Sequence, residues 1–298
     1  MKDMLFIMNP CAGTKKANRY YMQLVELFNR SGYRVTAYIT EGRGDAAKVA
    51  EELASGMDAV VCCGGDGTFN ETLSGVMAAG GDIPIGYIPA GSTNDFATSL
   101  ELPSGIMRCA KNIVEGKSTP YDVGLFNDRY FSYVASFGAF TKASYATSQN
   151  VKNALGHTAY ILGGISELSQ IHKIKAKFVL DGSEVVEDEF LFGAVCNSTS
   201  VAGLLTLDKS VVDMRDGKFE VLLVRAPKNL SEINECIKAI QNKTYDCKML
   251  TFRSASEIEV TMEEPVDWTL DGEYQPGLSE IRLKNCHLAL KLLTKGQS

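Results

Sequence analysis

The chain has 298 residues, of which 45% are hydrophobic and 22% charged, so it can form one large or two ordinary globular domains. Its formal net charge of −6 argues against nucleic acid as a partner, because nucleic-acid binding needs a basic face. There is no apolar run near the ~18 residues of a transmembrane segment and no signal peptide, so we expect a cytoplasmic protein. Its eight cysteines form no Cys-x-x-Cys pair, and we predict that they are small core residues.

The first 124 residues alternate predicted strands with predicted helices. Apolar runs predict strands over 5–8, 33–40, 59–61 and 85–88. Amphipathic or capped segments predict helices over 14–30, 45–54, 68–77, 93–100 and 106–115. Such alternation is typical of a parallel sheet covered by helices, and ligands bind beyond the carboxyl ends of its strands. Three polar or glycine-rich turns meet at these ends: 9–13, 64–68 and 89–95.

The pattern changes near residue 124 to short strands separated by turn signals. Strands are predicted over 176–180, 189–196, 217–224, 256–262 and 278–284. Helices are predicted over about 154–173 and over 230–241. We therefore predict an N-terminal α/β domain (1–124) followed by a C-terminal antiparallel β-sandwich domain (125–286). A last apolar strand, 287–293, could return to either domain.

The turn Gly64-Gly65-Asp66-Gly67-Thr68 follows a buried strand and opens a helix. Glycines let the backbone approach a ligand, and amides at a helix start attract phosphate. A carboxylate beside phosphates repels them unless a cation lies between, so Asp66 indicates a nucleotide phosphate together with Mg²⁺. A tight strand-to-helix turn without any ligand remains the alternative.

A second glycine segment, Gly42-Arg43-Gly44-Asp45-Ala46-Ala47, matches the Gly-x-Gly-x-x-Ala dinucleotide fingerprint. It follows the second predicted strand rather than the first, and the Gly64 turn competes with it for the same role. We therefore do not expect it to bind NAD. The Walker A pattern is absent from the sequence.

Five motifs occur in a defined order along nearly the whole chain. They are Asn9-Pro10-x-x-Gly13, Gly64 to Thr68, Gly91-Ser92-Thr93-Asn94-Asp95-Phe96-Ala97, Asp213 to Lys218, and Leu270-Asp271-Gly272-Glu273. This combination resembles the diacylglycerol kinase catalytic-domain family. The likeness is greatest to its soluble bacterial lipid kinases, which are related to sphingosine kinases and distantly to NAD kinases. The resemblance implies an NAD-kinase-like α/β nucleotide domain followed by a β-sandwich domain.

The resemblance also implies which residues bind the nucleotide and the metal. The ATP contacts that it implies are Asn9, Gly13, Thr40, Gly64, Gly65, Asp66, Gly67, Thr68, Asn70, Glu71 and Thr93. The acidic residues that it implies around Mg²⁺, directly or through water, are Asp66, Asp95 and Asp122. This chain has Gly-Ser-Thr-Asn-Asp where many members have Gly-Thr-Gly-Asn-Asp, and we expect no loss from small or hydroxyl replacements.

Glu273 matches the general base of the family, which would accept the proton of a lipid hydroxyl as that oxygen attacks the γ-phosphate. Taken alone, Asp271-Gly272 reads as a hairpin turn and Glu273 as a solvated strand residue. Asp216, with carbonyl oxygens from Asp213 and Lys218, matches a second, structural Mg²⁺ site. A metal-free turn at Asp216-Gly217 is an equally good interpretation.

These features predict an ATP- and Mg²⁺-dependent lipid kinase that phosphorylates a diacylglycerol-like acceptor at the membrane surface by in-line transfer. The acceptor groove is less visible: an apolar tract at 155–165 and the alternating lysines Lys173, Lys175 and Lys177 could face it, but a core helix and a solvated strand face are the simpler interpretations. An NAD kinase and a nucleotide-binding regulator without turnover are the alternative functions. Whether the chain forms a homodimer is left open.

Overall fold

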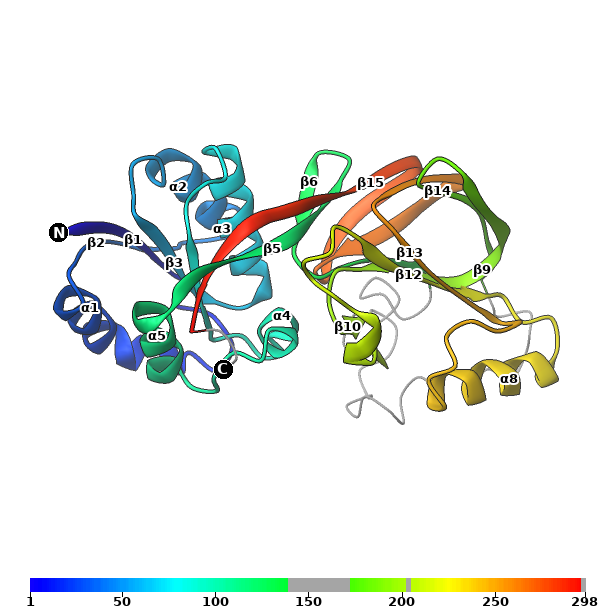
Figure 1. The fold of residues 1–298 in the computed structure, drawn as a ribbon, viewed down its shortest axis with the longest axis horizontal. Coiled ribbons are helices and arrows are strands. Elements are labelled where there is room, and N and C mark those ends of the chain that lie inside the picture. Colours follow the sequence, from blue (N-terminus) through cyan, green and yellow to red (C-terminus); the bar gives the residue numbers. More distant parts are fainter. Residues whose placement is uncertain (139–171, 202–204, 296–298) are drawn as a thin grey trace. The chain divides into compact units, whose positions relative to one another are not determined.

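The computed structural model describes residues 1–138, 172–201 and 205–295. The chain divides into two compact units (Figure 1): unit 1 comprises Met1–Val123 with His287–Ser298, and unit 2 comprises Gly124–Cys286. Both ends of the sequence therefore belong to unit 1. Unit 2 is formed by the segment between them.

Unit 1 contains a parallel sheet with the strand order β4-β3-β1-β2. Its strands are β1 (Lys2–Met8), β2 (Tyr33–Ile39), β3 (Ala59–Gly64) and β4 (Ile85–Pro89). The end of β15 (Glu273–Thr294) joins this sheet in parallel, with Leu292 opposite Ile85 on β4. All residues of β3 are buried, as expected for a strand covered on both faces.

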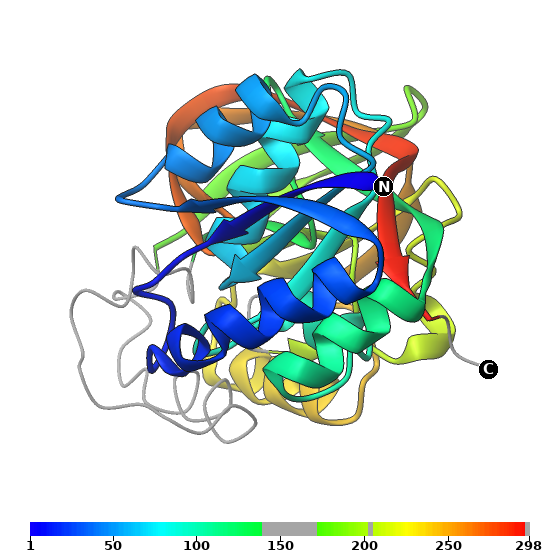
Figure 2. The ribbon, with the colours of Figure 1, turned by 90° about the vertical axis from the view of Figure 1, so that its left-hand side faces the viewer.

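Helices cover both faces of this sheet. They are the 3-10 helix η1 (Lys16–Tyr20), α1 (Tyr21–Arg30), α2 (Asp45–Leu53), α3 (Asp66–Ala78), the short α4 (Asp95–Ser99) and α5 (Ile106–Glu115). Leu24 and Phe28 of α1 share one core with Ile113 of α5 and with Phe6 and Val61 of the sheet. In Figure 2 the pair α2 and α3 lies on the other face. The parallel α/β arrangement predicted for this region is present, although the helix predicted over 14–30 begins as a 3-10 segment.

Unit 2 consists mainly of antiparallel strands. They include β7 (Val134–Gly138), β8 (Ile174–Leu180), β9 (Glu184–Cys196), β12 (Phe219–Arg225), β13 (Leu250–Ala255), β14 (Glu257–Leu270) and the first part of β15. β5 (Lys117–Phe126) enters the unit and pairs with β6 (Arg129–Phe131). The unit also contains β10 (Ser200–Val201), β11 (Leu205–Thr206), a 3-10 turn (Lys209–Val211) and α8 (Leu230–Gln241). The core is aromatic, with Trp268 packed edge-on against Phe126 and tilted against Phe137.

Several predicted boundaries differ from the structure. β13 was not predicted, and the strands expected over 278–284 and 287–293 form one continuous strand, β15, because its residues up to Lys284 pair with β14 and Leu292 pairs with β4. The final strand segment belongs to unit 1. The helix predicted over 154–173 and the apolar tract 155–165 lie almost wholly outside the described residues. The cysteines are all free thiols, but Cys11 is exposed rather than a core residue because it lies in the loop after β1.

Candidate active site

Three loops at the carboxyl ends of the unit 1 strands touch one another through glycine backbone. A Cβ on Gly91 would lie 2.7 Å from the Cα of Gly65, and one on Gly13 would lie 2.5 Å from the carbonyl oxygen of Ala90. Gly13 also has a φ of +50°, a conformation that favours glycine. Gly64 is enclosed by the side chain of Thr68, 2.5 Å from its would-be Cβ. Gly13 and Gly91 are therefore required by close packing between the loops predicted to hold phosphates, and Gly64 by close packing within its own loop.

Polar side chains connect the same loops. The side-chain amide of Asn9 donates to the Thr68 hydroxyl at 2.9 Å, and the backbone amide of Asn9 donates to the carbonyl of Cys63. Thr40, at the end of β2, is buried and donates its backbone amide to the Met8 carbonyl. The structure thus brings together Asn9 and Thr68, which sequence analysis assigned to nucleotide binding, and places Thr40 beside β1.

Asp66 lies in the first turn of α3 and contacts the start of α4. Its carboxylate accepts hydrogen bonds from the backbone amides of Asp95 at 3.0 Å and Phe96 at 3.4 Å, and from the Tyr87 hydroxyl at 3.4 Å. An acidic side chain at a helix start is electrostatically favourable. Two predicted acidic residues, Asp66 and Asp95, are therefore neighbours in space. Tyr87 was not predicted, because a tyrosine inside a buried strand ordinarily reads as core.

Asn94 fixes the shape of the loop after β4. This residue has a φ of +57°, and its side chain both accepts from the Gly91 amide and donates to the Gly91 carbonyl, each at 2.9 Å. Thr93, the residue before it, is exposed. The predicted ATP contact Thr93 is therefore available to a ligand, on a loop that is fixed at Gly91.

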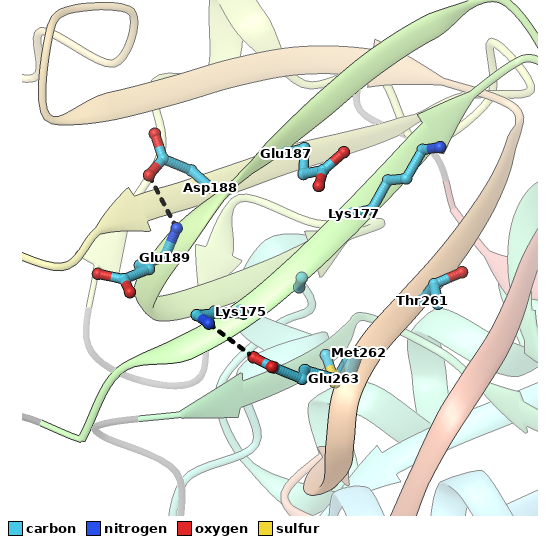
Figure 3. A pocket seen from close by; sticks show the side chains of 9 residues that line it. Lys175, Lys177, Glu187, Asp188, Glu189, Thr261, Met262 and Glu263 are labelled. Atoms are coloured by element: carbon cyan, nitrogen blue, oxygen red, sulfur yellow. Dashed lines mark hydrogen bonds and ion pairs between the residues drawn. The ribbon is translucent and has the colours of Figure 1, made fainter.

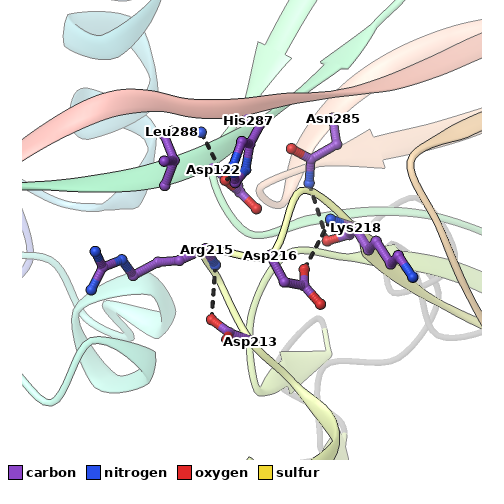
Figure 4. Close-up of polar contacts among 8 residues, drawn as sticks. All are labelled: Asp122, Asp213, Arg215, Asp216, Lys218, Asn285, His287 and Leu288. Carbon is purple, nitrogen blue, oxygen red and sulfur yellow. Dashed lines mark hydrogen bonds and ion pairs between the residues drawn. The ribbon is translucent and has the colours of Figure 1, made fainter.

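The side chain of Asp122 is completely buried, whereas a residue that contacts a ligand directly needs some exposed surface. Figure 4 shows its carboxylate beside His287 and Leu288, all three in unit 1. Oδ1 accepts from the Leu288 amide at 2.8 Å and lies 3.0 Å from Nδ1 of His287. Leu288 has a φ of +54°, which is strained for a bulky side chain. Asp122 therefore stabilises an irregular point of β15.

The segment that matches the dinucleotide fingerprint is occupied by carboxylates. The amide of Gly44, which precedes α2, donates to Oε1 of Glu71 at 2.7 Å. The amide of Glu41 donates to Oδ2 of Asp45 at 2.8 Å. Two negative groups at this helix start disfavour a phosphate there. That this segment does not bind a dinucleotide stays a prediction, and these carboxylates make its surroundings unfavourable for phosphate.

In unit 2, Glu273 follows a two-residue hairpin turn formed by Asp271 and Gly272, with φ values of +50° and +76°. This is the geometry that Asp-Gly favours between antiparallel strands. Asp271 is buried, and its carboxylate accepts from the amides of Ser132, Tyr133 and Val134 and from the Ser132 hydroxyl, at 2.6 to 3.1 Å.

Burial raises the pKa of the Asp271 carboxyl, and these hydrogen bonds act in the opposite direction. Glu273 itself is partly exposed. Asp271 thus anchors the turn that presents Glu273. The sequence showed the turn, but not this buried anchor.

The loop 213–218 of unit 2 contains two local side-chain to backbone hydrogen bonds (Figure 4). Asp213 accepts from the Arg215 amide at 3.0 Å, and Asp216 accepts from the Lys218 amide at 2.9 Å. The Lys218 carbonyl accepts from the Asn285 side chain at 3.1 Å. Within the part of the chain that the structure describes, no group of three or more His, Cys, Asp or Glu residues could hold a metal.

The lysines of β8 lie on the exposed face of unit 2, as their alternation predicted. Figure 3 shows the pocket on this face, where Lys175 pairs with Glu263 at 3.0 Å. Lys173 pairs with Glu189 at 3.7 Å. The acidic side chains among the residues around this pocket are Glu187, Asp188, Glu189 and Glu263. Because carboxylates offset these lysines, the surface is not a basic patch that would attract anionic headgroups. Among the described helices, none has both the length and the apolar character needed to cross a membrane.

Comparison with known proteins identifies relatives over nearly the whole chain. A family model described as the diacylglycerol kinase catalytic domain matches residues 3–126. The chain is 30% identical over 279 residues to the diacylglycerol kinase of Bacillus subtilis (strain 168), covering 92% of this chain and 90% of that protein.

The fold is also found in solved structures, of which two serve as examples. The crystal structure of a diacylglycerol kinase from Bacillus anthracis str. Sterne has a TM-score of 0.73 and 22% identity, and the match covers 98% of this chain and 97% of that one. An NAD kinase from Archaeoglobus fulgidus in complex with ATP has a TM-score of 0.53 and 16% identity, with 98% of this chain and 94% of that one covered. At these identities the likeness concerns the fold alone, which is α/β.

Proposed function

Because the chain belongs to the diacylglycerol kinase family and is a lipid kinase, we propose that it transfers the γ-phosphoryl group of ATP to a hydroxyl of a diacylglycerol-like lipid, with Mg²⁺ as cofactor. The main support for ATP as the phosphate donor is the contact between the glycine loops of unit 1. There, a side chain on Gly91 would have no room beside Gly65. Glycine backbone at strand and helix ends is a typical phosphate-binding arrangement. We assign ATP binding to these loops together with Asn9, Thr40, Thr68 and Thr93.

The acceptor chemistry is assigned to Glu273. In the proposed step, the lipid hydroxyl oxygen forms a bond to the γ-phosphorus while the bond from that phosphorus to the β-γ bridging oxygen breaks, and ADP leaves. The hydroxyl proton passes to the Glu273 carboxylate, which acts as general base. Support comes from its partial exposure and from the hairpin fixed by Asp271, since a base must be held in place to act.

The donor set of unit 1 fits Mg²⁺, which prefers oxygen ligands and keeps several waters. Bound Mg²⁺ would offset the charge of the phosphoryl oxygens. Asp66 and Asp95 would hold it, because Asp66 is tied to the Asp95 amide and both are partly exposed. Asp122 is fully buried, so we assign it an indirect effect, through the backbone of Leu288.

A second Mg²⁺ would be held at 213–218 by the Asp216 carboxylate and by carbonyl oxygens of Asp213 and Lys218. The Asp216 carboxylate and the Lys218 carbonyl each accept one N–H and keep further lone pairs. They fit a hydrated ion, since a single carboxylate with carbonyls needs waters to complete the shell. Its role would be structural, in holding this loop of unit 2.

The test is phosphate transfer from radiolabelled ATP to a panel of acceptors: diacylglycerol, monoacylglycerol, phosphatidylglycerol, sphingoid bases and NAD. Labelled diacylglycerol-like lipid is the expected product. Labelling of NAD alone would instead identify an NAD kinase. ATP binding without any labelled acceptor, unchanged by Glu273→Ala, would identify a nucleotide-binding regulator.

A further inference from the structure

Glu71 connects two helices of unit 1 at the carboxyl edge of the sheet. It lies on α3, and its carboxylate Oε1 accepts a hydrogen bond from the backbone amide of Gly44 at 2.7 Å. Gly44 is the residue immediately before α2 and has a φ of +82°. Glu71 therefore provides an acceptor for an amide at the start of a different helix, where a free N–H would otherwise face solvent.

The close approach of α2 and α3 explains why Glu71 reaches this amide. Gly75 lies four residues after Glu71 and so on the same face of α3. A Cβ on Gly75 would lie 2.2 Å from the Ala47 carbonyl oxygen and 2.6 Å from the Ala50 Cβ. The helices are therefore in backbone contact next to Glu71, and the distance that its side chain must span is set by that contact.

The surroundings of Gly44 argue against a direct contact between Glu71 and phosphate. Asp45 is a second carboxylate at the same helix start; it accepts from the Glu41 amide at 2.8 Å and from the Tyr38 hydroxyl at 3.0 Å. Two carboxylates that accept from groups around one helix start disfavour a phosphate group there. The ATP contact that the family resemblance implied for Glu71 is therefore a poor fit to its environment.

The loop that Glu71 holds, residues 41–44, directly follows Thr40, the first residue after β2, and β2 is the last strand in the order of the parallel sheet. A loop after such a strand depends on side-chain contacts to keep its shape, and here they come from Glu71 and Asp45. We propose that Glu71 is a positioning residue: by accepting from Gly44 it fixes the 41–44 loop beside Thr40, and through this loop it sets the affinity for ATP. This role rests on the proposed nucleotide site.

The experiment compares Glu71→Gln, which keeps the acceptor oxygen but loses the charge, with Glu71→Asp, which keeps the charge but is too short to reach Gly44. Glu71→Ala removes both, and Glu51→Ala on the exposed face of α2 is the control. The Kd for ATP with Mg²⁺ is measured by calorimetric titration, KM and kcat by lipid phosphorylation, and exposure of the 41–47 backbone by hydrogen exchange.

We expect the alanine and aspartate variants to raise the Kd and KM for ATP about tenfold, the effect of one hydrogen bond, with kcat within about twofold of wild type. Exchange of the 41–47 amides should become faster in both variants. Glu71→Gln and Glu51→Ala should resemble wild type. The same rise in Kd and KM is predicted for Glu71→Asp. The role of Glu71 can therefore still be tested if Glu71→Ala does not fold.

The proposal would be overturned if Glu71→Asp left the Kd for ATP unchanged, which would show that Glu71 has no such role. It would also be overturned if Glu71→Gln were as impaired as Glu71→Ala, which would indicate an effect of charge. A fall in kcat with unchanged KM would instead indicate a catalytic group. If the wild-type protein phosphorylates no lipid, the proposed function fails, while the calorimetric Kd values still decide the role of Glu71.

Discussion

The two units hold their candidate functional groups by opposite means. In unit 1 the loops are shaped by glycines that lack a side chain, because Gly13 and Gly91 touch the backbone of neighbouring loops. In unit 2 the turn before Glu273 is shaped by a side chain, the buried Asp271 carboxylate, which accepts from successive backbone amides. Unit 1 should therefore be sensitive to added atoms, and unit 2 to removed ones.

The chemistry assigned to each unit explains this difference. Phosphate is bound well by backbone amides, which a ligand reaches only where side chains are absent. A general base is a side chain, so its backbone must be fixed from behind. Asp271 can fix this backbone because its side chain is buried, whereas Glu273, two residues later, is partly exposed.

The largest effect is expected for Glu273→Gln. Loss of the general base should lower kcat by about 10²- to 10⁴-fold, while the Kd for ATP and the thermal stability stay unchanged. Steady-state kinetics and calorimetry measure these quantities. Glu280→Gln, at an exposed position of the same strand, is the matched control. A Glu273→Gln variant with full kcat would remove Glu273 from the chemistry.

A large loss of stability is expected for Asp271→Ala. The amides of Ser132, Tyr133 and Val134 would lose this buried acceptor, and each such loss costs about 1–3 kcal/mol, so unfolding free energy should fall by at least about 3 kcal/mol. Denaturant titration measures it. Asp181→Ala, in the exposed hairpin turn between β8 and β9, removes hydrogen bonds to Ser256 and Glu257 and should cost less. Equal losses in both variants would contradict a special role for the buried turn.

Gly91→Ala tests the opposite sensitivity in unit 1. The added methyl would lie 2.7 Å from the Gly65 Cα, so we expect a loss of about 1–3 kcal/mol in stability and weaker ATP binding. Gly42→Ala is the control for stability, because nothing lies within 4 Å of its would-be Cβ. Thermal denaturation should separate the two variants, and ATP titration compares Gly91→Ala with the wild-type protein. A wild-type ATP affinity in Gly91→Ala would show that the contact between the loops does not shape the nucleotide site.

The smallest effect concerns the accessibility of three cysteines of unit 1, of which Cys11 lies in a loop of the proposed ATP site. Burial raises the pKa of Cys63 to about 12 and of Cys109 to about 11, whereas Cys11 is exposed between Asn9 and Gly13. A thiol reagent at pH 8 should therefore modify Cys11 well before these two, and ATP with Mg²⁺ should slow its modification. Peptide mass mapping measures the rates, with Cys11→Ser as control. Equal rates with and without ATP would place the nucleotide away from this loop.

The local elements of unit 1 were largely predictable because strand and helix signals alternate and the glycine turns follow directly on buried strands. α5 and α8 have the predicted bounds, Ile106–Glu115 and Leu230–Gln241. In unit 2 the strand lengths were less predictable: β13 carries no turn signal that separates it from β14, and β15 passes without interruption from one unit into the other.

The sequence by itself determined the α/β alternation, the order of the motifs and the Asp271-Gly272 turn, because these depend on residues adjacent in the chain. Only the tertiary structure decided which acidic groups meet backbone amides. Asp66 accepts from Asp95, Glu71 from Gly44, and Asp122 from Leu288, 166 residues away. Such pairings depend on how strands and helices pack, since a carboxylate accepts whichever donor packing brings within reach.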